Sequence, residues 1–196
     1  RLGPYAIIDI ISGKAGENDV VVTDVGQHQM WTAHRYPFKK PRTFLTSGGL
    51  GTMGYGMGAA IGAATTGKRS ILFTGDGSFG MNLNELATAA VQNSPLVIVI
   101  MNNGVLGMVR QWQTLFFNKH YSNTTLNRPT DFVKLAEAFG IKAARAFTAE
   151  ELEKAAAEAF SENRPYLIDC AVDCNEFVLP MLPPGGSIDD IITEIK

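Results

Sequence analysis

Residues 70–77, Ser-Ile-Leu-Phe-Thr-Gly-Asp-Gly, and residues 95–104, Pro-Leu-Val-Ile-Val-Ile-Met-Asn-Asn-Gly, decide the fold of this chain. Their apolar runs are continuous rather than alternating, which is typical of strands buried on both faces of a parallel sheet. We therefore predict strands at residues 70–74 and 95–101. The more polar residues 82–92 between them predict the crossover helix, with Asn82 and Glu85 spaced as a capping box.

Each of these two strands is followed directly by a polar side chain. Asp76 follows the first strand, and Asn103 lies 27 positions later, after the second. In a right-handed βαβ unit both strands point the same way, so these side chains emerge at the carboxyl edge, where α/β sheets bind ligands. Asp-Gly and Asn-Gly are also common turn dipeptides, so neither is specific alone. Together they predict an incomplete oxygen shell for Mg²⁺, shared with a phosphate group.

The composition is that of an ordinary globular domain. The chain has 196 residues, of which 45% are hydrophobic and 18% charged, and its formal net charge is −2. We expect a single domain over residues 1–196 with an extended tail at 183–196. The scattered charges do not favour nucleic acid or an anionic membrane as a partner. No apolar stretch reaches the roughly 18 residues of a membrane span, so the expected location is cytoplasmic.

Strands and helices alternate along most of the chain, which predicts a doubly wound α/β fold. We expect about six mostly parallel strands with helices on both faces. The remaining strands are predicted at residues 20–23, 42–46, 143–147 and 166–171. The remaining helices are predicted to begin at residue 26 and to cover residues 59–64, 107–117, 131–139 and 149–163.

A glycine-rich run offers a competing interpretation. Gly49, Gly51 and Gly54 satisfy the dinucleotide-binding spacing, and Asp76 lies where a ribose-binding acid is expected. The strand before this run is short and polar, however, and a nucleotide site leaves Asn103 without a role. In either interpretation, we expect glycines to allow close approach of a phosphate and the following helix to offer unpaired N–H groups.

Several longer motifs resemble those of a known family. Gly75-Asp76-Gly77 followed by Asn102-Asn103 resembles the thiamine-diphosphate motif. Three further segments, at residues 24–31 (Asp-Val-Gly-Gln-His-Gln-Met-Trp), 46–54 (Thr-Ser-Gly-Gly-Leu-Gly-Thr-Met-Gly) and 107–113 (Gly-Met-Val-Arg-Gln-Trp-Gln), resemble the catalytic subunit of acetolactate synthase. The similarity covers residues 4–182 and implies a thiamine-diphosphate-binding fold.

The resemblance implies roles for individual residues. Asp76, Asn103 and the backbone carbonyl of Val105 would hold Mg²⁺. Met53 would support the cofactor in a bent shape, and Trp112 would stand at the mouth of the substrate and inhibitor channel. The other implied cofactor-binding residues are Gly26, Gln27, His28, Gly51, Gly77, Ser78, Asn103 and Met108.

The resemblance also implies a reaction. Such enzymes decarboxylate pyruvate and join it to a second 2-keto acid, giving acetolactate or acetohydroxybutyrate for branched-chain amino acid synthesis. Their subunits carry two further domains, one of which holds FAD, and they assemble as homo-oligomers of at least two subunits. The sequence does not decide whether a regulatory subunit also binds. Because this chain resembles only the C-terminal domain, it lacks the activating glutamate, so we expect no catalytic residue here and no activity alone. The alternatives are another thiamine-diphosphate enzyme, of glyoxylate carboligase or pyruvate oxidase type, or a nucleotide-binding module.

Overall fold

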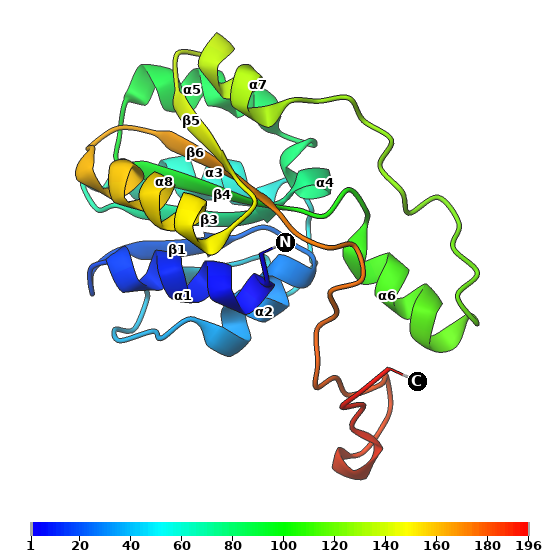
Figure 1. Cartoon of the computed structure of the whole chain (residues 1–196). Coiled ribbons are helices and arrows are strands. Elements are labelled where there is room, and N and C mark those ends of the chain that lie inside the picture. Colours follow the sequence, from blue (N-terminus) through cyan, green and yellow to red (C-terminus); the bar gives the residue numbers. More distant parts are fainter. Residues whose placement is uncertain (1, 196) are drawn as a thin grey trace.

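The computed structural model describes residues 2–195 and has a six-stranded parallel sheet at its centre (Figure 1). The strand order is β2-β1-β3-β4-β6-β5, and every neighbouring pair is parallel. The doubly wound α/β prediction is therefore confirmed. The strands are β1 (Val20–Thr23), β2 (Phe44–Leu45), β3 (Ser70–Gly75), β4 (Leu96–Asn102), β5 (Lys142–Ala146) and β6 (Tyr166–Ala171).

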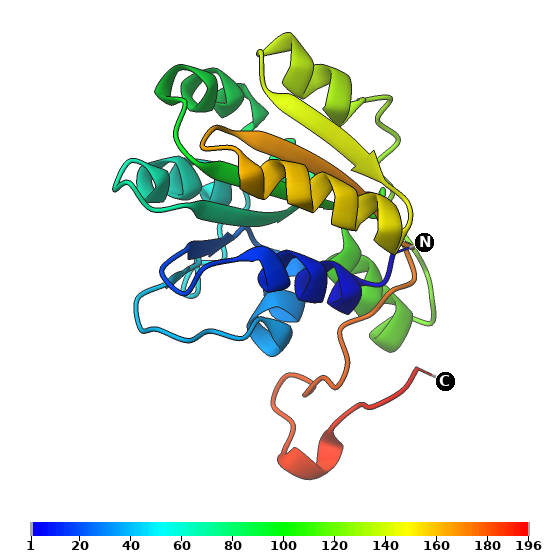
Figure 2. The ribbon, with the colours of Figure 1, turned by 60° about the vertical axis from the view of Figure 1, so that its left-hand side comes forward.

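Helices cover both faces of the sheet because successive strand residues point to opposite sides. One face, which includes Val21, Phe73 and Val99, packs against α1 (Pro4–Lys14), α2 (Gln27–Arg35) and α8 (Ala149–Ser161). Figure 2 shows α1 and α8 side by side across this face. The other face, which includes Leu72 and Ile100, packs against α3 (Tyr55–Ala64), α5 (Leu86–Gln92) and α7 (Phe132–Ala138).

The chain changes direction between β1 and β3. After β1 it enters α2 on one face, and after β3 it passes through α4 (Asp76–Phe79) to α5 on the other. Such a switch point opens a crevice at the carboxyl ends of the strands, where doubly wound folds bind their ligands. The helix α6 (Gly107–Phe116) lies beyond this same edge (Figure 1).

Several sequence predictions of elements need correction. The helix α1 was not predicted, β2 is only two residues long, and α3 begins at Tyr55 rather than at residue 59. The predicted crossover helix is divided into a 3-10 turn (Leu83–Glu85) and α5. The capping box is wrong: Asn82 donates its side-chain amide to the Gly54 carbonyl, and Glu85 accepts from Asn84 and Thr88. These tertiary and local partners compete with the cap.

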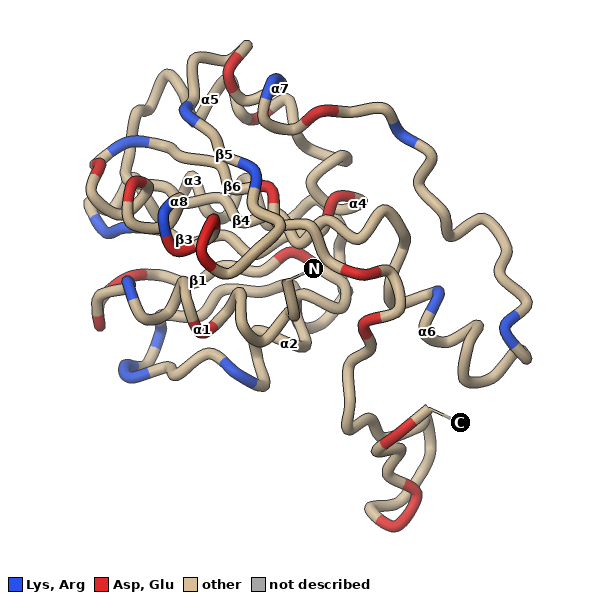
Figure 3. The backbone as a smooth tube through the Cα atoms, viewed as in Figure 1, with Lys and Arg blue, Asp and Glu red and all other residues tan. Residues whose placement is uncertain are grey.

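The end of the chain leaves the sheet and forms a small lobe beside α6 (Figures 1 and 2). It contains a short 3-10 turn (Ile188–Asp190) and a bridge between Met181 and Ile192. Figure 3 shows residues of both charge signs interspersed over the rest of the tube. Among residues 2–195, no helix combines the length and apolar character needed to cross a membrane.

Candidate functional site

A cleft lies at the switch point, between the starts of α2 and α4 and the loop after β4. Ten of the residues singled out from the sequence line it: Gly26, Gln27, His28, Met53, Asp76, Gly77, Ser78, Asn103, Val105 and Met108. Gly51 and Trp112 are not among its lining residues. The enclosed space is about 90 Å³, far below the roughly 300 Å³ at which pockets for whole small molecules begin. This cleft therefore suits one end of a large ligand.

Asp76 and Asn103 come together as their strand positions predict. Gly75 and Met101 are register partners in β3 and β4, so the residues after them share the carboxyl edge. Burial raises the pKa of the Asp76 carboxyl to about 6, while backbone N–H groups, including that of Asn103, act against this shift. An ionised carboxylate in such a place is stabilised by a nearby cation.

The donor set fits a magnesium ion that is shared with a phosphate. Within residues 2–195 no three His, Cys, Asp or Glu side chains cluster as metal ligands. A cation at Asp76 would therefore depend on neutral amide and carbonyl oxygens and on a ligand's own charge, as Mg²⁺ does when it binds with phosphates.

His28 supplies a second sign that the cleft is built for a ligand. Its ring is buried, and its Nε2 atom has no hydrogen-bond partner among the described residues. Burial lowers the pKa of His28 to about 3, although a hydrogen bond to the Asp24 carbonyl acts in the opposite direction. Buried polar atoms are normally paired, so an orphaned nitrogen lining a cleft points to a missing partner.

Gly26 shapes the start of α2 at this cleft. Its φ angle of 151° lies in the region that favours glycine, and a Cβ atom there would stand 2.8 Å from the His28 ring. The helix that follows directs the positive end of its dipole towards the cleft, an arrangement that favours an anion.

The side chains of Gln27 and Ser78 already have partners within the protein. The Gln27 amide nitrogen donates to Gln111 and to the Glu176 carbonyl, and its oxygen accepts from Asn103. The Ser78 hydroxyl donates to the Val25 carbonyl at 2.8 Å. At these two positions, backbone N–H groups rather than side chains are the groups to consider for a diphosphate.

The glycine-rich run differs from its sequence-based expectation. The Asp24 carboxylate accepts hydrogen bonds from the N–H groups of Gly54 and Gly56 at the start of α3. These N–H groups are therefore not unpaired, and a carboxylate stands where a phosphate would need to lie. The prediction of an anion cradle at this helix start is wrong, and the dinucleotide interpretation loses its main support.

Gly107 is a site residue that the motif analysis did not assign. It begins α6, and a Cβ atom on it would lie 2.0 Å from the Gln27 side-chain oxygen and 2.7 Å from the Asn103 side-chain nitrogen. Only glycine lets α6 approach these two amides so closely. The available signal was a glycine at a helix start shortly after Asn-Asn.

A wide apolar groove adjoins the cleft along α6. It has a volume of about 760 Å³, and Met108 and Val109 line both spaces. Trp112 lies in this groove, is 40% exposed and contacts Phe116 edge-on. The predicted channel residue is thus next to the cleft rather than inside it.

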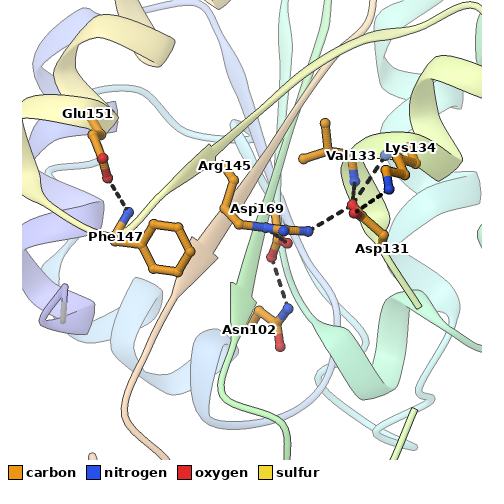
Figure 4. A network of polar contacts seen from close by, with 8 residues as sticks. All are labelled: Asn102, Asp131, Val133, Lys134, Arg145, Phe147, Glu151 and Asp169. Carbon is orange, nitrogen blue, oxygen red and sulfur yellow. Dashed lines mark hydrogen bonds and ion pairs between the residues drawn. The ribbon is translucent and has the colours of Figure 1, made fainter. Parts of the chain in front are cut away.

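Asn102, the residue before Asn103, belongs to a separate polar network (Figure 4). Its side-chain amide donates to Asp169 at 3.0 Å, and Asp169 accepts from Arg145 at 3.0 Å. Arg145 also pairs with Asp131, which caps the start of α7. This network links the ends of β4, β5 and β6 to α7.

Comparison with known proteins gives a consistent result. Residues 24–170 match the family model described as "Thiamine pyrophosphate enzyme, C-terminal TPP binding domain". The chain is 48% identical over 182 residues to a Methanocaldococcus jannaschii protein named "Probable acetolactate synthase large subunit", covering 92% of this chain and 31% of that protein. It is 43% identical over 188 residues to "Acetolactate synthase isozyme 2 large subunit" of Escherichia coli, covering 95% and 34% of the two chains.

A solved structure shares the fold. Benzoylformate decarboxylase from Polynucleobacter necessarius superposes with a TM-score of 0.81 at 24% identity, over 91% of this chain and 34% of that one. The chain therefore spans about a third of the length of these proteins.

Proposed function

The chain belongs to the C-terminal TPP-binding domains of thiamine pyrophosphate enzymes, and we propose that it binds thiamine diphosphate through Mg²⁺. The ion is held by the Asp76 carboxylate, the Asn103 side-chain oxygen and the backbone carbonyl of Val105. The observation that carries this proposal is the buried Asp76 carboxyl at the strand edge next to Asn103. A divalent cation offsets the cost of keeping this carboxylate ionised away from water.

The diphosphate lies at the start of α2 and against the backbone of Gly77 and Ser78. Since His28 donates to the Asp24 carbonyl from one ring nitrogen, its unpaired Nε2 is an acceptor while the ring is neutral. A contact from Nε2 to phosphate requires that His28 take up a proton. The negative charge of the diphosphate favours this uptake.

The whole protein acts as an acetolactate synthase. This proposal rests on relatives that carry that name and are 48% and 43% identical over nearly all of this chain. Thiamine diphosphate, when bound, supplies the carbon nucleophile that decarboxylates one 2-keto acid and joins it to another. Met53 gives apolar support at the cleft, and Met108 and Trp112 line the groove from which the keto acids approach.

Further parts of this proposal concern the rest of such an enzyme. A pyrimidine-binding domain with the activating glutamate, an FAD-binding domain, a second subunit and a regulatory subunit complete the functional assembly. The small volume of the cleft supports this division, because the rest of the cofactor needs another surface. We place the protein in the cytoplasm, while relatives in Nicotiana tabacum and Saccharomyces cerevisiae are named chloroplastic and mitochondrial.

Calorimetry with thiamine diphosphate tests the binding proposal. We expect heat of binding in the presence of Mg²⁺ and none with EDTA. Asp76→Ala should abolish the Mg²⁺-dependent binding, because the only ionic protein ligand is lost. Asp9→Ala, which removes an exposed carboxylate paired with Arg35, is the matched control and should bind normally. Unchanged binding by Asp76→Ala would contradict the proposal.

A product assay tests whether this chain needs the other domains for activity. With pyruvate, thiamine diphosphate and Mg²⁺, this chain alone should form no acetolactate, because the activating glutamate belongs to another domain. Clear acetolactate formation by the chain alone would show that account to be wrong. Tests of the whole enzyme with other reactants separate the alternatives. Acetate and CO₂ formed from pyruvate in the presence of an electron acceptor such as a quinone would favour a pyruvate oxidase, and tartronate semialdehyde and CO₂ formed from two molecules of glyoxylate would favour a glyoxylate carboligase.

A further inference from the structure

We propose that Gln111 is a positioning residue that sets which end of the Asn103 side-chain amide faces the cation site. It acts through Gln27 and touches neither the ion nor the diphosphate. The inference deepens the proposed function and rests on it for the role of Asn103. Its physical basis is a chain of three amides, two of them buried and that of Asn103 half-buried, whose orientation is fixed by the backbone.

The first amide is that of Gln111, which is fully buried in α6. Its Oε1 atom accepts from the Val178 N–H at 2.8 Å, and its Nε2 atom donates to the Val178 carbonyl at 3.0 Å. A backbone N–H can only donate and a carbonyl can only accept. The two groups of Val178 therefore permit a single orientation of the Gln111 amide.

The second amide is that of Gln27, which is also buried. Its Nε2 atom donates to Gln111 Oε1 and to the Glu176 carbonyl, both at 2.9 Å. Because both partners are acceptors, the nitrogen of Gln27 must face them. Its Oε1 atom is consequently turned towards Asn103.

The third amide is that of Asn103. Its Nδ2 atom donates to Gln27 Oε1 at 3.3 Å, while its Oδ1 atom accepts from the Val105 N–H at 3.1 Å. The oxygen, which is the end that binds a cation, is thus held away from Gln27. If the amide turned over, it would present its N–H₂ group to the cation.

Every member of this amide chain is neutral. The chain can therefore fix the orientation of Asn103 without adding a charge near Asp76. Gly107 completes the arrangement, since a side chain there would occupy the space of the Gln27 and Asn103 amides. Residues that orient a metal ligand in this way typically change metal affinity about 10–100-fold when they are replaced.

Two substitutions of Gln111 separate orientation from packing. Gln111→Met has a similar volume but removes one of the two acceptors of Gln27, so only the Glu176 carbonyl still holds the orientation of the Gln27 amide. Gln111→Glu keeps that acceptor, and because burial favours the neutral carboxylic acid, its O–H can replace the donor to the Val178 carbonyl. Both variants should melt at a lower temperature than the wild type: Gln111→Met leaves both backbone groups of Val178 unpaired, and Gln111→Glu must keep a buried carboxyl protonated.

Calorimetric titration of the full chain with Mg²⁺ in the presence of thiamine diphosphate gives the first readout. We expect Gln111→Met to weaken Mg²⁺ binding about tenfold or more and Gln111→Glu to remain close to the wild type. In an Asn103→Asp background, where both ends of the side chain are oxygens, Gln111→Met should cause no further loss. The inference would be overturned if Gln111→Met and Gln111→Glu lowered the Mg²⁺ affinity equally. It would also be overturned if Gln111→Met lowered the affinity of Asn103→Asp as much as it lowers that of the wild type.

A ligand-free readout keeps this test separate from the proposed function. The Asn103 side-chain N–H₂ resonance, assigned by its disappearance in Asn103→Asp, should contain one slowly exchanging proton in the wild type and in Gln111→Glu. Gln111→Met should lose this protection. If the wild type binds no Mg²⁺ in the presence of thiamine diphosphate, the proposed function is wrong. The exchange rate of the Asn103 amide protons would still show whether Gln111 fixes the orientation of that amide. Persistent protection in Gln111→Met would overturn the inference.

Discussion

Asn102 and Asn103 are neighbours in the chain, yet their side chains enter two differently built surroundings. Asn102 donates to Asp169, which is paired with Arg145 and through it with Asp131 (Figure 4). Asn103 instead meets the neutral amide of Gln27. We call the surroundings of Asn102, formed by Asp169, Arg145 and Asp131, the charged side. The surroundings of Asn103, formed by the amides of Gln27 and Gln111, are the neutral side.

The two sides also differ in their contact with water. The side chains of Arg145 and Asp131 are 37% and 34% exposed, although that of Asp169 is only 3% exposed, whereas Gln111 is fully buried. Charges that reach water can stabilise a sheet edge and a helix start at modest cost. Buried neutral amides fix direction, because each has a donor end and an acceptor end. The comparison suggests that the charged side provides stability and the neutral side provides orientation.

Gly107→Ala should give the largest effect, because it breaks the neutral side. The new methyl group would lie 2.0 Å from the Gln27 oxygen, so the Gln27 and Asn103 amides must move apart. We expect a loss of about 3–5 kcal/mol in the free energy of unfolding, from overpacking and from unpaired buried amides. Mg²⁺ affinity should fall at least about tenfold. Denaturant unfolding and calorimetry provide the measurements.

A glycine in open space provides the control for that prediction. Gly58 lies within α3, and a Cβ atom there would meet nothing within 4 Å. Gly58→Ala should therefore stabilise the chain by about 0.5–1 kcal/mol. If Gly107→Ala behaved like Gly58→Ala, α6 could not pack against the amides as described.

The pH dependence of the free energy of unfolding tests whether the folded chain keeps His28, at the cleft, in its neutral form. The pKa of His28 is lowered to about 3 in the folded chain, from an ordinary value of 6.5. Between these values the unfolded chain binds the additional proton, so the free energy of unfolding should decrease as the pH falls from 6.5 towards 3. The slope from this single group approaches about 1.4 kcal/mol per pH unit. The effect of His28→Gln should therefore become more favourable as the pH falls.

Asp76 affects the same pH range in the opposite direction. Burial raises its pKa from 3.8 to about 6, so its protonation stabilises the folded chain as the pH falls through that interval. Asp76 is present in both the wild type and His28→Gln, so the difference between their unfolding curves isolates His28. A difference that does not change with pH would show that His28 is not held neutral.

Asp169→Asn should give a smaller effect, confined to stability. The variant removes the charge that Arg145 faces, although Arg145 keeps its pair with Asp131. Because Arg145 is partly exposed, water screens the loss, and we expect about 1–3 kcal/mol. Mg²⁺ affinity should remain unchanged within error. A large decrease in affinity would remove the distinction between the charged and neutral sides.

The sequence alone predicted the strands that carry the site. The uninterrupted apolar runs of β3 and β4 reflect burial on both faces, so their ends could be located from residue types. The same logic places Asp76 and Asn103 at one edge of the sheet. Motif resemblance then added the cofactor-binding candidates, and ten of the residues it named line one cleft.

The errors came from partners that are distant in sequence. Asn82 does not form its predicted cap because its side chain donates to the Gly54 carbonyl. The start of α3 has no unpaired N–H at Gly54 or Gly56 because the Asp24 carboxylate accepts from both.

The helix α1 was missed for a different reason. No element was predicted before the strand at residues 20–23, yet α1 lies there and buries Ile7, Ile8 and Ile11 against the sheet. Its many apolar residues give no clear helical periodicity.

The sequence by itself determined the parallel sheet, the polar residues at its carboxyl edge and the family resemblance, because strand burial and short motifs are local properties. Only the tertiary structure decided how the amides of the site are oriented. Gln27 is 84 positions from Gln111 and 76 from Asn103, and Gln111 is 67 from Val178. The direction of a hydrogen bond depends on which donor and acceptor meet in space, and no local pattern records that.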